Sequence, residues 1–181
     1  MKSPAAIAGW LPQVPPRADN YRPWLVDGGS LTRRLQERCA AFRVVPVRQV
    51  LRPSLIDEQP LLAARPREWL TTREVFLCCG DTPVVFAHSV VRREDLRGPW
   101  RWVGGLGARP LGAALFADPR IERTPLVFRA IGRHHPLFSR ATSVLEHPPG
   151  ALWARRSIFL RERVPLLVTE VFLPAVLELP R

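Results

Sequence analysis

The sequence predicts an α+β fold with a single, mainly antiparallel six-stranded sheet and a few helices at one side or end of it. Six segments are rich in the branched and aromatic residues typical of strands, and only two have helical spacing. Consecutive strand segments are joined too tightly for parallel crossovers, which favours antiparallel pairing. The strands are expected at 42–51, 69–79, 83–92, 124–132, 153–161 and 165–173.

The first half of the chain supplies an arm, a helix and an edge strand. Residues 1–20 are rich in proline and alanine and are expected to form a loose arm, so that 21–181 make one domain. Ser30 has the character of a helix N-cap. After it, Leu31, Leu35 and Cys39 recur at four-residue spacing on one helical face. Pro46 places the first strand at an edge or a bulge.

The second half alternates strand pairs with loops. Gly80-Asp81 is a turn signal and predicts a hairpin between the second and third strands. The glycine- and tryptophan-rich tract 96–107 is expected to be a loop, and a short helix over 110–117 can start at its proline. Residues 133–150 read as a long irregular loop. Arg161 to Val164 form the last turn.

Composition and cysteine content exclude several classes of protein. The chain has 181 residues, 46% of them apolar, with no run of 18 apolar residues, so no membrane span is expected. The N-terminal sequence is a poor secretory signal, and a cytoplasmic location is expected. Cys78 and Cys79 are adjacent on a strand and face opposite ways. The odd count and the absence of C-x-x-C spacing argue against a disulfide framework or a zinc site.

The net charge of +11 suggests an anionic partner. Nucleic acid, an acidic membrane surface and an anionic small molecule all have that chemistry. Lys2 is the only lysine, so the excess of arginine is typical of codon bias in a GC-rich genome. The arginines are scattered and no nucleic-acid-binding motif is present, so no nucleic-acid partner is expected.

Glu170 is the single carboxylate of the last strand and the first candidate for function. Alternate strand residues share a face, so Glu170 points the same way as Leu166, Val168 and Phe172. A charge among such neighbours is costly unless something pairs with it. Three interpretations stay open: a structural ion-pair partner, a solvent-facing residue, or a working acid.

Arg73 is the second candidate. It lies on the strand 69–79 and shares a face with Thr71, Val75 and Leu77, while Glu74 points to the other face. Arginine suits a buried anion because its planar fork binds a carboxylate at two places. The alternative is a charge on the exposed face of a strand.

Blocks distributed along the chain resemble the bacterial chorismate pyruvate-lyase family, whose members make 4-hydroxybenzoate for ubiquinone. Together they cover about residues 22–175, and their order and spacing are more specific than any block alone. The blocks are Trp24–Leu25, Ser30–Leu35, Arg73–Cys78, Leu106–Gly112, Leu115–Phe116, Ile131–Arg133, Arg155–Ser157 and Pro165–Pro174.

The resemblance implies a lyase that uses no cofactor and no metal, with chorismate lyase-like topology, a buried cavity and chorismate as substrate; we expect a monomer. Its product-binding arginine matches Arg73 and its essential glutamate matches Glu170. Leu31 matches a position that contacts the ligand through a helix start, and Leu111 matches a cavity-lining leucine. His88 departs from the enterobacterial pattern, where an arginine helps catalysis, although a histidine can still donate to an anion.

The chemistry of chorismate makes two cationic contacts necessary, since it carries two carboxylates. Arg73 would bind the ring carboxylate, and His88, Arg133 or Arg155 the enolpyruvyl carboxylate. The reaction removes a ring proton beside the 4-hydroxyl and expels the enolpyruvyl ether as pyruvate. If desolvated, Glu170 would hold a proton and act as general acid.

Two other classes remain as alternatives. Effector domains of GntR-type regulators share this sheet but normally follow a winged-helix DNA-binding module, and residues 1–20 are too few to form one. A nucleic-acid binder is supported by charge alone, and a steep salt dependence of binding would reveal it.

Overall fold

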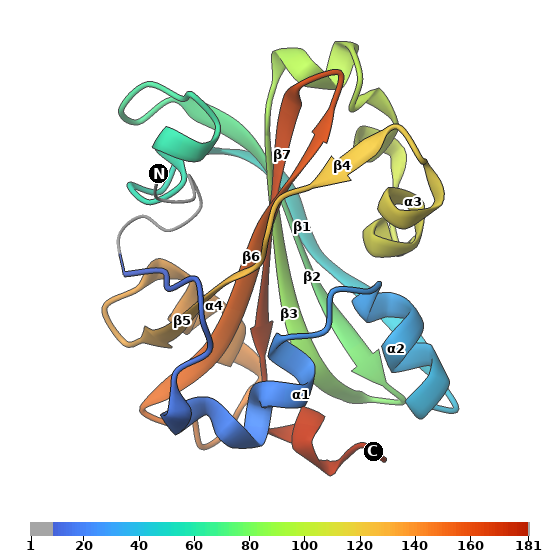
Figure 1. Ribbon diagram of the computed structural model, residues 1–181, viewed down its shortest axis with the longest axis vertical. Coiled ribbons are helices and arrows are strands. Elements are labelled where there is room, and N and C mark those ends of the chain that lie inside the picture. The colour runs from blue at the N-terminus through green and yellow to red at the C-terminus, as the bar shows by residue number, and fades with distance from the viewer. Residues whose placement is uncertain (1–8, 181) are drawn as a thin grey trace.

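A computed structural model describes residues 9–180 and contains one antiparallel sheet of seven strands (Figure 1). The order across the sheet is β1-β2-β3-β7-β6-β4, and β5 also pairs with β6. The α+β prediction is therefore confirmed, with one strand more than expected. The strands are β1 (Phe42–Pro53), β2 (Trp69–Cys79), β3 (Thr82–Arg92), β4 (Ile121–Arg123), β5 (Val127–Gly132), β6 (Ala151–Arg161) and β7 (Val164–Phe172).

The extra strand is β4, which lies just before the segment expected as one strand over 124–132, and β5 forms within that segment. The two strands pair separately with the two halves of β6. Pro125 lies between them, and a proline cannot donate a hydrogen bond to a ladder. Pro46 acts as expected in β1, since this edge strand shifts register between Pro46 and Arg48.

Both predicted hairpins are present. Gly80 adopts a φ of +59° in the turn between β2 and β3, a conformation that glycine reaches at no steric cost. The turn between β6 and β7 uses Glu162 and Arg163, with φ of +53° and +65°. Two consecutive positive φ values are typical of the turns that match the twist of a hairpin.

The helices are short and lie around the sheet. The α-helices are α1 (Arg22–Leu25), α2 (Leu31–Arg38), α3 (Leu111–Ala117) and α4 (Pro136–Ala141). The 3-10 helices are Pro16–Tyr21, Gln59–Leu61, Glu94–Arg97, Arg101–Gly105, Thr142–Val144 and Pro174–Glu178. Among the residues described, no helix is long and apolar enough to cross a membrane.

Three expectations about irregular segments need correction. The tract 133–150 contains α4, capped by the side chain of His135 and held by the buried residues Leu137 and Phe138. The tract 96–107 contains 3-10 turns whose buried anchor is Trp100, 0% exposed. Residues 9–20, expected as part of a loose arm, pack against the sheet: Trp10 is buried and Leu11 bridges Phe128. Residues 1–8 lie outside the described part of the chain.

A disulfide joins Cys39, at the end of α2, to Cys79, at the end of β2. The cysteine count did not indicate this bond, so the argument against disulfides is wrong for this pair. Cys78 is buried and free.

Each face of the sheet carries its own core. One face packs under α1, α2 and α3, with Leu31, Leu35, Val75, Leu111 and Phe159 among its buried residues. The opposite face packs under α4, Trp10 and the segment around Leu61, and buries Phe76, Phe86 and Val171. The site described next lies within the first of these faces.

Candidate functional site

An enclosed pocket lies between the sheet and the first turns of α2 and α3. Four of the five predicted site residues, Arg73, Glu170, Leu31 and Leu111, line it. Apolar side chains make up most of the remaining wall. These other lining residues include Val44, Val75, Leu77, Ala87, Ser89, Leu115, Phe116, Arg123, Phe159 and Val168.

Arg73 is a buried cation at the β2 end of the pocket, with only 4% of its surface exposed. Its Nη2 donates to the carbonyls of Gly107 at 2.9 Å and Arg109 at 3.0 Å. Burial lowers the pKa of the guanidinium. Within residues 9–180 no carboxylate pairs with it, so an uncompensated positive charge faces the pocket.

Glu170 lines the same pocket from β7 and is also an ion-pair partner. Its Oε2 accepts from Arg155 Nε at 2.5 Å, across the register of β6 and β7. Arg155 is itself fixed, because its Nη1 donates to the carbonyls of Trp24 at 2.9 Å and Asp27 at 2.6 Å. Within residues 9–180, Glu170 Oε1 accepts no hydrogen bond. One oxygen is thus anchored and the other is available to a ligand.

The sequence left Glu170 open as a structural ion-pair partner, a solvent-facing residue or a working acid. The ion pair with Arg155 is present, and the same side chain lines the pocket.

The first turns of α2 and α3 close the pocket. Ser30 caps α2 by accepting from the backbone N–H of Arg33 at 3.4 Å. A Cβ on Gly112 would lie 2.9 Å from Thr32 Oγ1, so only glycine allows the two turns to approach this closely. Leu31 and Leu111 are the first residues of their helices. Their backbone N–H groups have no intrahelical acceptor and can bind a ligand.

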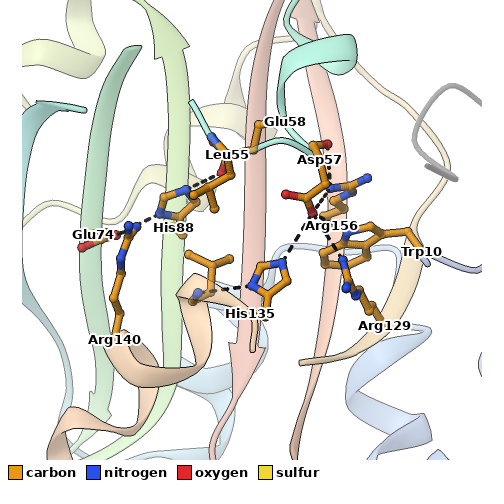
Figure 2. Close-up of polar contacts among 11 residues, drawn as sticks. Trp10, Leu55, Asp57, Glu58, Glu74, His88, Arg129, His135, Arg140 and Arg156 are labelled. Atoms are coloured by element: carbon orange, nitrogen blue, oxygen red, sulfur yellow. Dashed lines mark hydrogen bonds and ion pairs between the residues drawn. The ribbon is translucent and has the colours of Figure 1, made fainter. Parts of the chain in front are cut away.

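His88 lies on the opposite face of the sheet and does not line this pocket, which corrects its predicted place in the site. Figure 2 shows it between Glu58 and Glu74. It faces Glu74 across β2 and β3, whereas its neighbours Ala87 and Ser89 face the pocket. Its Nδ1 lies 3.1 Å from Glu74 Oε1, and its Nε2 lies 2.7 Å from Glu58 Oε1.

The surroundings of His88 hold it as a cation. Burial lowers its pKa, but Glu58 and Glu74 outweigh burial and raise the pKa to about 9. Burial raises the pKa of Glu74, but His88 and Arg140 outweigh it and lower the pKa to about 2. Arg140 Nη1 lies 2.7 Å from Glu74 Oε1. The group therefore connects α4, β2, β3 and the segment before Gln59 through buried charges.

A second charged group lies nearby on that same face, around Asp57 (Figure 2). Burial opposes ionisation of Asp57, but hydrogen bonds from His135 and Trp10 hold its pKa well below its usual range. Arg156 Nη1 also donates to its Oδ2 at 3.0 Å. Among residues 9–180, no group of three or more His, Cys, Asp or Glu side chains has the arrangement of a metal site.

Comparisons with known proteins identify the family of the chain. The family model for chorismate lyase matches residues 7–179. The chain belongs to the chorismate lyase family. It is 50% identical to a Nitrosomonas eutropha protein named "Probable chorismate pyruvate-lyase", over 99% of this chain and 100% of that one. A Nitrosomonas europaea protein with the same name is 52% identical, over 84% and 86% of the two chains.

Solved structures similar to this member of the chorismate lyase family are distant in sequence and show the fold alone. The C-terminal domain of PhnF matches with a TM-score of 0.56 and 14% identity, over 71% of this chain and 80% of that one. A GntR-family transcriptional regulator from Enterococcus faecalis matches with a TM-score of 0.51 and 13% identity, over 73% and 89%.

Two pocket features of this chorismate lyase family member were not predicted. Arg155, expected as a possible ligand contact, holds Glu170 from outside the pocket wall. Arg123 lines the pocket, and the sequence did not predict it there. Its three-residue strand follows a turn, and only its pairing with β6 brings it to the site. The order of strands in the sheet determines the position of Arg123, and the local sequence pattern does not indicate it.

Proposed function

We propose that the protein eliminates pyruvate from chorismate and leaves 4-hydroxybenzoate. The observation that carries this proposal is the buried guanidinium of Arg73, which faces an enclosed apolar pocket and has no carboxylate partner among residues 9–180. A buried guanidinium without a counter-ion favours binding of an anionic ligand, and the apolar walls suit a flat ring. Relatives named chorismate pyruvate-lyase, identical at half of their positions, support this choice of substrate.

The ring carboxylate is proposed to bind Arg73. The Nη2 atom is occupied by two carbonyls, so the carboxylate would contact the remaining N–H groups of the guanidinium. The free N–H groups of Leu31 and Leu111, at the helix starts, would add contacts at the same end of the ring.

Glu170 is proposed to move the proton. It lies two strands from Arg73, about 10 Å across the sheet, so the two side chains would contact opposite ends of one ring. The free oxygen of its carboxylate would take the proton from C4 while the C3–O bond breaks. The same proton then passes to the departing enolpyruvate, which becomes pyruvate. The carboxylate is regenerated, and aromatisation of the ring drives the reaction.

We also propose a pathway, an oligomeric state and a location for the protein. The product would serve ubiquinone formation, and the protein would act as a monomer in the cytoplasm. The Cys39–Cys79 disulfide counts against a reducing compartment, where such bonds are rare. Alkylation of free thiols in intact cells distinguishes the two compartments. Three free cysteines are expected in the cytoplasm, and Cys78 alone where the Cys39–Cys79 bond forms.

The proposal is tested with the substitution Glu170→Gln. Glutamine keeps the size of the side chain but cannot exchange the proton, so turnover of chorismate should fall about 10²–10⁴-fold. The exposed Glu178, substituted in the same way, serves as the control for loss of one carboxylate. Both the rate and the melting temperature are measured.

A purely structural Glu170 would give a different pattern. The substitution would then lower the melting temperature through the orphaned Arg155 and leave the rate per folded molecule unchanged. A near wild-type rate in Glu170→Gln would remove Glu170 from the chemistry.

A further inference from the structure

Arg123 is a second cation in the pocket, held in place by neutral groups. Its Nε donates to Ser157 Oγ at 2.8 Å, and its Nη1 donates to the carbonyl of Gly28 at 2.9 Å. The guanidinium lies 5.4 Å from the ring centre of Phe116 and 5.3 Å from that of Phe159. Among residues 9–180 no carboxylate forms an ion pair with it, so its charge is available to a ligand.

None of the cations proposed from the sequence for the second carboxylate can make that contact. His88 lies on the other face of the sheet, between two carboxylates. Arg155 already donates hydrogen bonds to Glu170 and to three backbone carbonyls, and it does not line the pocket. Arg133 is exposed at the end of β5 and does not line the pocket either.

The position of Arg123 fits a ligand with two charges. The sheet order places Arg73 on β2, Glu170 on β7 and Arg123 on β4, so the two cations flank the carboxylate within one pocket. Ser157, which receives the hydrogen bond of Arg123, stands opposite Val168 in the register, two residues from Glu170. Arg123 thus belongs to the end of the pocket where the proposed C–O cleavage takes place.

We infer that Arg123 binds the carboxylate of the enolpyruvyl group and makes the pocket selective for a dicarboxylate. This inference rests on the proposed function. The substrate carries one carboxylate on the ring and a second on the ether side chain, whereas 4-hydroxybenzoate has only the first. Arg73 therefore holds substrate and product alike, and Arg123 recognises the part that leaves as pyruvate.

The test compares the two ligands in a background whose turnover is strongly reduced. Chorismate and 4-hydroxybenzoate are titrated calorimetrically into Glu170→Gln and into the double variant that adds Arg123→Gln. Loss of one charge-assisted contact should weaken chorismate binding about 10- to 100-fold. Affinity for 4-hydroxybenzoate should change less than about threefold. Arg120→Gln, an exposed arginine in the same segment, controls for net charge.

Each other outcome contradicts the inference. Unchanged chorismate affinity excludes Arg123 from substrate recognition, and an equal loss for both ligands assigns it a structural role. If Arg123→Gln does not fold, Arg123→Lys keeps the charge, and it must still prefer chorismate over 4-hydroxybenzoate. Failure of the proposed function appears separately, as wild-type protein that does not convert chorismate.

Discussion

Arg73 is the residue whose surroundings most clearly require a bound anion. Replacing it with alanine should weaken 4-hydroxybenzoate binding by about 1.5–3 kcal/mol, the range for a hydrogen bond to a charged group. Calorimetry measures this directly, with Arg97→Ala as a control because Arg97 is exposed. Unchanged product affinity in a folded Arg73→Ala protein would show that the carboxylate binds elsewhere.

For single residues, the alternation of strand side chains between the two faces of the sheet predicted which residues line the pocket better than residue type did. It placed Arg73 with Val75 and Leu77, and Glu170 with Val168, and all five line one pocket. It could not place His88, because the face of a strand residue is fixed only when the register with its neighbours is known. In that register His88 stands opposite Glu74, on the face away from the pocket.

At the scale of elements, the buried charges around His88 join α4 to the sheet and should make stability depend on pH. Protonated His88 contacts both Glu58 and Glu74, and its pKa in the folded state, about 9, exceeds the ordinary value of 6.5. Because the folded pKa is raised, this stabilisation is fully present below about pH 6.5 and is lost as the pH rises through about 9. The loss is on the order of 3 kcal/mol.

Urea denaturation between about pH 6 and pH 9.5 measures that change. His88→Gln cannot lose a proton, so its free energy of unfolding should vary less with pH over this window than that of the wild type. Equal slopes for the two proteins would mean that His88 is not held as a cation in the folded state.

The elements themselves were predicted where patterns were long. The hairpins, α2 and the last strand follow from alternation, turn residues and a cap. α4 was missed because its six residues begin at Pro136 within a segment rich in histidine and proline, and only its packing against the sheet stabilises so short a helix. The Cys39–Cys79 bond was missed because the two ends meet only in the folded sheet.

At the scale of the whole molecule, the net charge of +11 favours approach of a dianion toward the protein, whichever residues bind it. Composition alone did not distinguish that partner from nucleic acid. The positions of two arginines make the distinction. Arg73 and Arg123 face an enclosed pocket, and neither forms an ion pair with a carboxylate in the described part of the chain.

Conversion of chorismate by the purified protein tests the central claim most directly. Protein treated with EDTA is incubated with chorismate, and 4-hydroxybenzoate and pyruvate are both quantified over time. Because the proposed elimination needs only proton transfer by Glu170 and binding by arginines, the two products should form in equal amounts and at an undiminished rate. Absence of 4-hydroxybenzoate, or activity that EDTA abolishes and a divalent ion restores, would contradict this account.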